Sequence, residues 1–271
     1  MNIDGYALVV GGGSGIGKAT AIGFAKEGAQ GVLVADIDLE AATKVAADSK
    51  ASATNPDFRA EAVQVDVTVP DSVQHAVSYM VETFGRIDYC ANTAGVTGKG
   101  LKYIGDTSFE QFQTVLDVNV NGLFHVMNAV LAVMKNQEPR ALDPNLPVRG
   151  LSRGTIVNMA SVSSFRGVPH AVSYTTSKHA VVGLTRVAAL DNVRHNIRVN
   201  CICPSWVDTP MLSRISSVTE GFEKMAVSQT PMGRLAAPEE IADAILFLAS
   251  PRASWVNGSS MVVDGALSIR P

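Results

Sequence analysis

Apolar and polar residues alternate along the chain in blocks whose lengths match strands and helices. Short runs rich in Val, Ile and Ala predict strands, and longer stretches with apolar residues three or four positions apart predict helices. Strands are expected over residues 6–10, 32–36, 61–67, 86–92, 154–161, 197–204 and 260–265. Helices are expected over residues 15–27, 39–49, 70–84, 109–135, 172–192 and 238–249.

Many of the strand segments are continuously apolar, as strands buried on both faces are. Their alternation with helices predicts an α/β fold, a doubly wound Rossmann-type parallel sheet of about seven strands flanked by helices. A length of 271 residues suits one such domain. We therefore expect a single domain over residues 1–271, with a glycine-rich cofactor half (about 1–153) and a catalytic and substrate-lid half (about 154–271).

Two stretches interrupt the alternation. Residues 135–154 are polar and carry three prolines, which predicts a surface excursion. Residues 209–237 are rich in Met, Ser and Thr with weak periodicity, which suits a mobile lid.

Composition narrows the class of protein. Hydrophobic residues make up 46% of the chain, so a large core is expected, and a net charge of −3 without any basic tract argues against a nucleic-acid partner. The N-terminal residues lack the features of a secretory signal, and we find no apolar run of roughly 18 residues, so no membrane partner is expected. Cys90, Cys201 and Cys203 are expected to be buried reduced thiols of a cytoplasmic protein, with no metal site.

The glycine-rich loop after the first strand fits two ligands. Residues 12–18 satisfy part of a nucleotide P-loop, but Ala19 stands where that loop needs a magnesium-binding Ser or Thr. Gly11, Gly15 and Gly17 instead fit a turn that brings the backbone close to a pyrophosphate at a helix N-terminus. We therefore favour a dinucleotide over ATP, whose P-loop hydrolysis would require magnesium.

Asp36, at the end of the second strand, indicates which dinucleotide. A carboxylate there can accept both hydroxyls of the adenosine ribose and repels a 2′-phosphate. Neither Ser14 nor Ile37 supplies a cation to hold that phosphate. NAD is therefore expected rather than NADP. The alternative, that Asp36 caps the helix beginning near Leu39, stays open, although Asp38 could take that role.

Tyr174 and Lys178 lie four residues apart on an expected helix, which places both side chains on one face. Ser161 ends the preceding strand. An unperturbed phenol has a pKa of about 10, and a nearby ammonium should lower that pKa and favour the phenolate as a base. A serine hydroxyl can hold the substrate oxygen as charge develops on it. This trio suits hydride transfer to or from a carbonyl carbon.

With these residues together, the chain resembles the short-chain dehydrogenase/reductase family from about Tyr6 to Ala266. The resembling segments are VGGGSGIG (10–17), DV (66–67), NTAG (92–95), DVNVNG around Asn119, the Ser161–Tyr174–Lys178 set and CPSWVDTP (203–210). Their order and spacing are similar to those of the family.

The resemblance implies a role for each matching residue. Tyr174 is the general acid/base, Lys178 binds the nicotinamide ribose and tunes the tyrosine, and Ser161 orients the substrate oxygen. Asn119 holds a water that extends the proton relay. Asp66 and Val67 flank the adenine, and further positions line the floor and bracket the nicotinamide amide. The full implied cofactor surface is Gly11, Ser14, Gly15, Ile16, Gly17, Asp36, Ile37, Asp66, Val67, Asn92, Ala94, Gly95, Tyr174, Lys178, Pro204, Val207 and Thr209.

Three residues depart from the family pattern. Val10 replaces a threonine whose hydroxyl braces the glycine loop, Thr93 stands where a second asparagine is frequent, and Ser205 replaces a glycine after Pro204. None of the three removes a catalytic group.

The lid contains candidate substrate contacts. Ser161, Tyr174, Trp206, Met211 and Leu212 are expected to touch the substrate. Phe222 and Met225 could complete an apolar roof, or all these lid residues could simply pack together. His170 could reach a substrate but is expected to be surface or pocket wall, and His179 is expected to be structural.

We expect an NAD(H)-dependent oxidoreductase that acts on a secondary alcohol or ketone, with a bulky apolar small molecule such as a steroid, terpenoid or polyketide as substrate. The alternatives are an NADP(H)-dependent ketoreductase and a non-catalytic dinucleotide-sensing regulator. A homo-oligomer, dimer or tetramer, is expected through the helices at 109–135 and 172–192. Their outward faces are expected to carry apolar residues such as Val130, Val133, Val181 and Leu184, although some of these must face the sheet.

Overall fold

The computed structural model describes residues 1–271 apart from 2, 99, 101, 270 and 271. The sheet strands are β1 (Tyr6–Val10), β2 (Gly31–Asp36), β3 (Arg59–Gln64), β4 (Tyr89–Asn92), β7 (Gly154–Met159), β8 (Ile197–Pro204) and β9 (Ser260–Val263). The α-helices are α1 (Gly15–Lys26), α2 (Leu39–Ser52), α3 (Pro70–Phe84), α4 (Phe109–Leu116), α5 (Leu123–Asn136), α6 (Val172–Asn192), α7 (Pro210–Val218), α8 (Phe222–Gln229) and α9 (Pro238–Ala249).

One parallel sheet of seven strands runs in the order β3-β2-β1-β4-β7-β8-β9. The chain starts in the middle at β1, builds outward to β3, then returns to the other side of β1 with β4. This reversal opens a crevice beyond the carboxyl ends of β1 and β4, where ligands bind in doubly wound folds. The expected doubly wound α/β fold of a single domain is confirmed.

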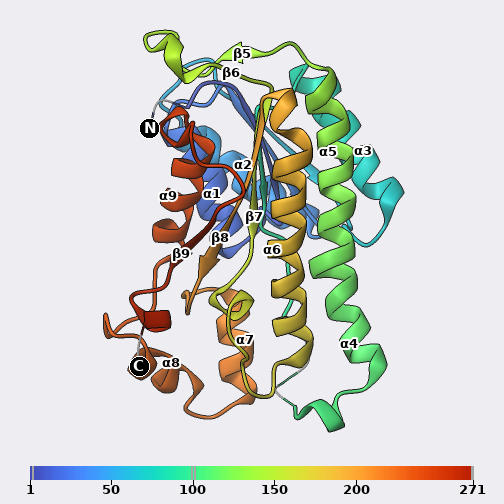
Figure 1. The fold of residues 1–271 in the computed structure, drawn as a ribbon, viewed down its shortest axis with the longest axis vertical. Helices are drawn as coiled ribbons and strands as arrows, with labels where there is room; N and C mark the ends of the chain where they lie inside the picture. Colours follow the sequence, from blue (N-terminus) through green and yellow to red (C-terminus); the bar gives the residue numbers. More distant parts are fainter. Residues whose placement is uncertain (2, 99, 101, 270–271) are drawn as a thin grey trace.

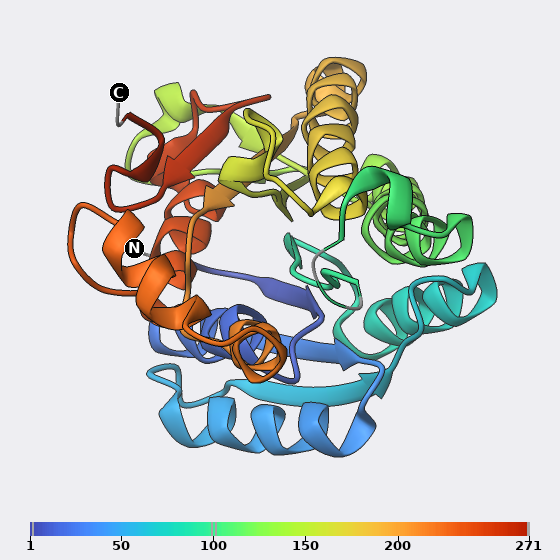
Figure 2. The same ribbon diagram turned by 90° about the horizontal axis from the view of Figure 1, so that it is seen from below.

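Helices cover both faces of the sheet (Figures 1 and 2). Side chains alternate along each strand, so Leu8 and Val10 enter the core with α3, α5 and α6, while Ala7 and Val9 enter the core with α1, α2 and α9. Every residue of β8 is buried. Burial on both faces explains why the strand segments are apolar without a polar alternation.

Several elements differ from the sequence prediction in their bounds, and three of these differences have a visible structural cause or consequence. The strand expected over 61–67 ends at Gln64, because its partner β2 ends opposite it at Asp36. The strand expected from residue 86 begins at Tyr89. The Ile87 amide donates to the Gln137 side-chain oxygen rather than to a neighbouring strand. The helix expected over 109–135 is interrupted by a π-helical segment, Asp117–Gly122.

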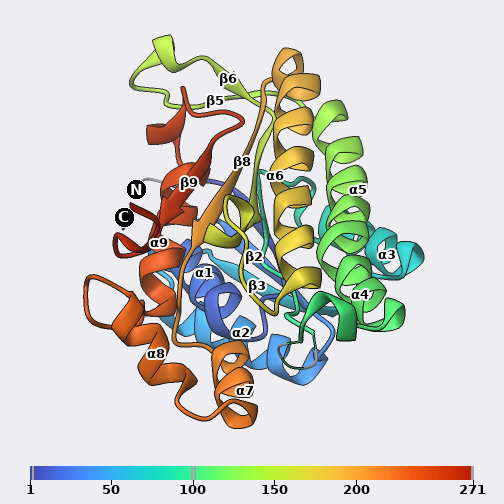
Figure 3. The ribbon, with the colours of Figure 1, turned by 60° about the horizontal axis from the view of Figure 1, so that its bottom comes forward.

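The two irregular stretches lie at opposite ends of the sheet. Residues 135–154 contain the short hairpin of β5 (Arg140–Ala141) and β6 (Leu151–Ser152), which Arg149 fastens by donating to the Pro251 carbonyl. The 209–237 stretch contains α7 and α8, which lie beyond the carboxyl end of β8 (Figures 1 and 3). The expected lid segment is therefore largely helical.

The outer helices carry apolar residues on both of their faces. The stretch Phe109–Asn136 is long and apolar enough, by length and composition, to cross a membrane. However, its inner side chains belong to the core against the sheet, as in any doubly wound domain. Contrary to the sequence interpretation, Val130, Val133, Val181 and Leu184 all pack in or against that core. The large apolar residues exposed on these helices are Phe109, Phe124, Val187 and Leu190.

Candidate active site

The glycine loop between β1 and α1 packs directly against the segment that follows β4. A Cβ on Gly11, which has φ +77°, would lie 2.4 Å from the Ala94 nitrogen, and one on Gly17 would lie 2.1 Å from the Gly11 carbonyl oxygen. Only residues without side chains can bring the loop this close. The N-cap residue Ser14 makes no side-chain capping bond, so the first helical amides remain to bind an anion. This cradle fits a pyrophosphate.

Thr93 braces the glycine loop from below. Its hydroxyl donates to the Val10 carbonyl at 2.7 Å and lies 3.2 Å from the Gly11 carbonyl. Thr93, directly after β4, thus supplies a hydroxyl to the loop where Val10 has none. These two departures from the family pattern therefore compensate each other. The third, Ser205, donates to the Asp264 carbonyl.

The lysine of the P-loop-like sequence is held away from any ligand. The Lys18 amino group lies 2.9 Å from the Asp48 carboxylate on α2. A P-loop lysine must instead reach the terminal phosphates. This ion pair, with Ala19 in the magnesium position, argues against the ATPase alternative.

Asp36 supports the glycine loop and leaves helix capping to its neighbour. Its carboxylate accepts from the Gly13 amide at 2.8 Å and from the Asp38 amide at 3.1 Å. Asp38 caps α2 by accepting from Ala41. The capping alternative for Asp36 is therefore wrong, and its carboxylate lies beside the glycine loop.

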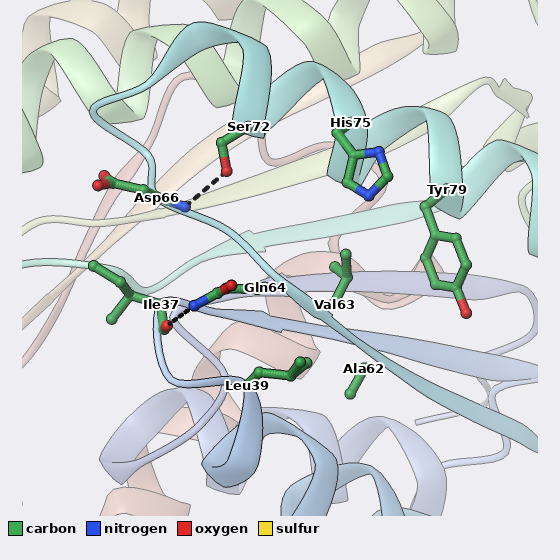
Figure 4. A pocket seen from close by; sticks show the side chains of 9 residues that line it. All are labelled: Ile37, Leu39, Ala62, Val63, Gln64, Asp66, Ser72, His75 and Tyr79. Carbon is green, nitrogen blue, oxygen red and sulfur yellow. Dashed lines mark hydrogen bonds between the residues drawn. The ribbon is translucent and has the colours of Figure 1, made fainter.

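A hollow of about 690 Å³ lies along β3, the edge strand of the sheet, and Ile37, the residue after Asp36, lines it (Figure 4). Ile37, 64% exposed, lies on one side with Leu39, and His75 and Tyr79 of α3 lie on the other. Asp66 stands at the inner end, where Thr68 donates twice to its carboxylate. Val67 is buried beneath Gly122. Ile37, expected on the cofactor surface, and Asp66, expected beside the adenine, thus line the same hollow.

Asn119 sits in the π-helical segment and ties three elements together. Its amide exchanges hydrogen bonds of 2.8 Å with both backbone groups of Val96 and donates to the Ser177 hydroxyl at 3.0 Å. π-Helical segments frequently occur at functional sites. Gly95 leaves space beside both Asn119 and Lys178, since its Cβ would lie 3.3 Å from the Asn119 oxygen and 3.6 Å from the Lys178 amino nitrogen.

Tyr174 and Lys178 share one face of α6, as their spacing predicts. The Lys178 amino nitrogen lies 5.5 Å from the centre of the Tyr174 ring and donates to the Met159 carbonyl at 2.7 Å. The Ser177 hydroxyl accepts from Asn119 and donates to the Tyr174 carbonyl, so it links Asn119 to the backbone of α6 at Tyr174. The sequence analysis overlooked Ser177, although its place between Tyr174 and Lys178 was visible.

Ser161 leaves the carboxyl end of β7 in an extended conformation and is buried beside Tyr174. Its hydroxyl accepts from the Ser163 amide at 3.1 Å and lies 3.5 Å from the Pro204 carbonyl. These contacts fix the hydroxyl where β7 and β8 end. Ser161, Tyr174 and Lys178 are therefore brought together at the mouth of the crevice.

Burial dominates the titration of both groups on α6. Burial raises the pKa of Tyr174, while a hydrogen bond from Ser161 works in the opposite direction. Burial lowers the pKa of Lys178 to about 8. The sequence leads us to expect a lower Tyr174 pKa from the nearby ammonium, but in the protein alone burial raises this pKa, because removing the phenolate from water costs more than the nearby groups return.

We expect the burial of Lys178 to make stability depend on pH. Its folded pKa of about 8 lies below the ordinary 10.5, so between these values the unfolded chain binds more protons and stability rises with pH. Relative to Lys178→Met, the wild-type free energy of unfolding should increase by about 2 kcal/mol from pH 8 to pH 10. Denaturant titrations measure this, with exposed Lys50→Met as control. A pH-independent difference would contradict it.

The opposite wall comes from the segment after β8. Thr209 caps α7 and faces the glycine loop, since a Cβ on Gly15 would lie 3.2 Å from its methyl carbon. Val207 is buried and paired with Ala236. Asn92 is buried at the end of β4, where its side-chain amide donates to the Asn158 side chain on β7 at 2.8 Å. Its side chain therefore joins two strands of the sheet.

The lid residues separate into two groups. Leu212 and Phe222 are buried, and the Phe222 ring meets the Trp206 ring edge-on at 5.3 Å, so these residues hold the lid together. Trp206 and Met211 are half-buried, and the Trp206 indole nitrogen has no hydrogen-bond partner within the described residues.

Cys90, Cys201 and Cys203 are buried and free, as expected. Among the described residues, no group of three His, Cys, Asp or Glu side chains is placed to hold a metal ion.

A glycine cradle at the switch point of a doubly wound sheet is typical of dinucleotide-binding domains. The tyrosine–lysine pair beside it has the residue types that can exchange a proton with a substrate oxygen. The chain belongs to the short-chain dehydrogenase/reductase family: the family described as Enoyl-(Acyl carrier protein) reductase matches residues 10–268.

Three known proteins illustrate the relationship. The chain is 52% identical to short-chain dehydrogenase fogB of Aspergillus ruber, over 99% of this chain and 98% of the relative. It is 36% identical to cyclohexanol dehydrogenase of an Acinetobacter species, over 96% and 93%. The crystal structure of 3-ketoacyl-(acyl-carrier-protein) reductase from Brucella melitensis complexed with NADH matches with a TM-score of 0.83 and 30% identity, over 97% and 98%.

Proposed function

We propose that this protein is an NAD(H)-dependent dehydrogenase that interconverts a bulky secondary alcohol and its ketone. The observation that carries the proposal is the convergence of Ser161, Tyr174 and Lys178 beside the glycine loop. Bound nicotinamide supplies hydride exchange with the substrate carbon. The residues of this chain must then hold the substrate oxygen and move its proton.

Each group has one task in the proposed mechanism. The Ser161 hydroxyl donates to the substrate oxygen, and the Tyr174 hydroxyl exchanges a proton with it. One of the three N–H donors of the Lys178 ammonium binds the Met159 carbonyl, which leaves two for the ribose. The positive charge of the ammonium favours the phenolate form of Tyr174. Asn119 keeps one free lone pair on its oxygen, which could accept from a relay water beside Lys178.

Cofactor binding is proposed along the crevice. The pyrophosphate contacts Gly11, Ser14, Gly15, Ile16 and Gly17, and the adenine lies by Ile37, Asp66 and Val67. Asn92, Ala94 and Gly95 form the floor, and Pro204, Val207 and Thr209 the nicotinamide side. Asp36 favours NAD, because its carboxylate repels a 2′-phosphate. The NADH complex of the Brucella relative supports this choice.

We expect Asp36→Asn to shift the cofactor preference toward NADP(H). The amide can still accept from Gly13 but no longer repels phosphate. The ratio of kcat/KM with NADP to kcat/KM with NAD should rise about tenfold. Steady-state kinetics measure it. Asp38→Asn, a neighbouring charge loss at a helix cap, should leave the ratio unchanged, and an unchanged ratio in Asp36→Asn would contradict the role of its charge.

The proposed substrate is bulky and apolar, in the size range of a steroid, terpenoid or polyketide. Trp206 and Met211 are half-buried apolar side chains in the segment after β8, whose Pro204 carbonyl lies 3.5 Å from the Ser161 hydroxyl, and the cyclohexanol dehydrogenase relative is named for a cyclic secondary alcohol. A panel of cyclic and linear alcohols, followed by the absorbance of reduced nicotinamide, tests the proposal. Turnover of small polar alcohols alone would contradict it. NAD binding without any turnover would instead favour the dinucleotide-sensing regulator.

We also propose a cytoplasmic homo-oligomer, a dimer or tetramer, that binds neither nucleic acid nor membranes. Free buried thiols are typical of a reducing compartment. Phe109, Phe124, Val187 and Leu190 leave apolar area exposed on the outer helices, which a second copy could cover. Sedimentation should give two or four copies, and a purely monomeric protein would contradict this.

A further inference from the structure

Tyr174 also lines a narrow pocket whose other polar residues have no role in the mechanism above. It lies between the segment after β4 and the loop that leads into α6. Its lining consists of Thr97, Gly98, Gly100, Lys102, Thr107, Gln111, His170, Ala171, Val172, Ser173 and Tyr174. Among the described lining residues, Lys102, His170, Gln111 and the hydroxyl residues have polar side chains, and none has a carboxylate.

Lys102 is fixed in this wall through its backbone. Its amide donates to the His170 carbonyl at 2.9 Å, and a parallel bridge pairs it with Ala171. Its amino group donates to the neutral Gln111 side chain at 3.2 Å. Among the described residues, no carboxylate forms an ion pair with it. The pocket therefore carries an uncompensated positive charge.

His170 is held in a conformation that costs energy. Its φ is +65°, in the left-handed region that residues with a Cβ rarely adopt. The Tyr103 ring meets the imidazole edge-on, with ring centres 4.3 Å apart. Such conformations persist where surrounding contacts enforce them, and they gather at binding sites. Here the Lys102 bond and the Tyr103 contact fix the imidazole four residues before the catalytic tyrosine.

We propose that Lys102 and His170 form a subsite for a carboxylate or another anionic oxygen group of the substrate. The proposal rests on the proposed function, because it places this group on the same molecule whose alcohol carbon faces Tyr174. A positive charge paired only with a neutral amide favours an anion over a neutral acceptor. The substrate is then amphipathic, with its apolar body toward Trp206 and Met211 and its anionic oxygen at Lys102.

The test compares a cyclic hydroxy acid, 4-hydroxycyclohexanecarboxylate, with its methyl ester. Lys102→Met should lower the ratio of kcat/KM for the acid to kcat/KM for the ester about tenfold, through KM. His170→Asn, which tolerates a left-handed backbone but removes the imidazole, should lower the ratio in the same direction. Lys44→Met, an exposed charge loss on α2, should leave the ratio as in the wild type.

Calorimetry of both compounds with the NAD-loaded protein gives a second readout. The wild type should bind the acid more tightly than the ester, and Lys102→Met should remove this difference. Equal binding of acid and ester by the wild type, or an unchanged ratio in Lys102→Met, would overturn the subsite. Turnover of the ester without preference for the acid refutes the subsite alone. Binding of the acid through Lys102 with no turnover of either compound refutes the proposed oxidation and leaves the subsite standing.

Discussion

Replacing Tyr174 with phenylalanine should lower kcat about a thousandfold, while the fold and dinucleotide affinity stay close to those of the wild type. The substitution removes only the hydroxyl that exchanges a proton with the substrate. The ring remains to pack over the Lys178 amino group, 5.5 Å from its centre. Single-turnover kinetics with a cyclic alcohol measure the chemical step, and fluorescence titration measures NAD affinity.

Tyr6→Phe provides the matched control. Tyr6 begins β1, at the opposite end of that strand from the glycine loop, and it packs against Phe84. Its loss of a hydroxyl should leave kcat unchanged. A Tyr174→Phe variant that retained more than about a tenth of wild-type activity would exclude Tyr174 as the general acid/base.

The second large effect is expected from Gly17→Ala, which should abolish measurable NAD binding and lower the free energy of unfolding by about 2–3 kcal/mol. The new methyl would lie 2.1 Å from the Gly11 carbonyl oxygen and 2.6 Å from the Thr93 hydroxyl. Backbone atoms cannot retreat as a flexible side chain can, so the loop must move out of its cradle. Calorimetric NAD titration and denaturant unfolding measure the two consequences.

Gly105→Ala is the control for this prediction. Gly105 also lies in a helical turn, but a Cβ there would meet nothing within 4 Å. It should bind NAD as the wild type does and change stability by less than about 1 kcal/mol. Normal NAD affinity in Gly17→Ala would show that the loop is not the pyrophosphate site.

Local patterns predicted the parts of the site that lie within one element. Helical periodicity placed Tyr174 and Lys178 on one face, and α6 does begin and end where the sequence predicts. The glycine spacing predicted a tight turn, because close approach and left-handed φ values restrict Gly11 and Gly15 to glycine. Strand burial was readable too, since only continuous apolar runs suit a sheet covered on both faces.

Contacts between distant segments could not be predicted in the same way. Nothing near Val10 indicates that Thr93 supplies the missing hydroxyl, since the two meet only through the pairing of β1 with β4. The π-helical segment at Asn119 is invisible in a helical pattern, because one widened turn leaves the periodicity almost unchanged. The burial of Leu212, which was expected at the substrate, likewise depends on segments that the local pattern does not place.

The sequence by itself determined the order of elements, the doubly wound sheet and the chemical identity of the candidate catalytic groups, because these depend on periodicity and residue type over short spans. Only the tertiary structure decided the environment of each group: the burial that controls the pKa values of Tyr174 and Lys178, the ion pair that withdraws Lys18, and the enforced backbone of His170. Those properties arise from desolvation and contact between segments far apart in the chain, which no local pattern encodes.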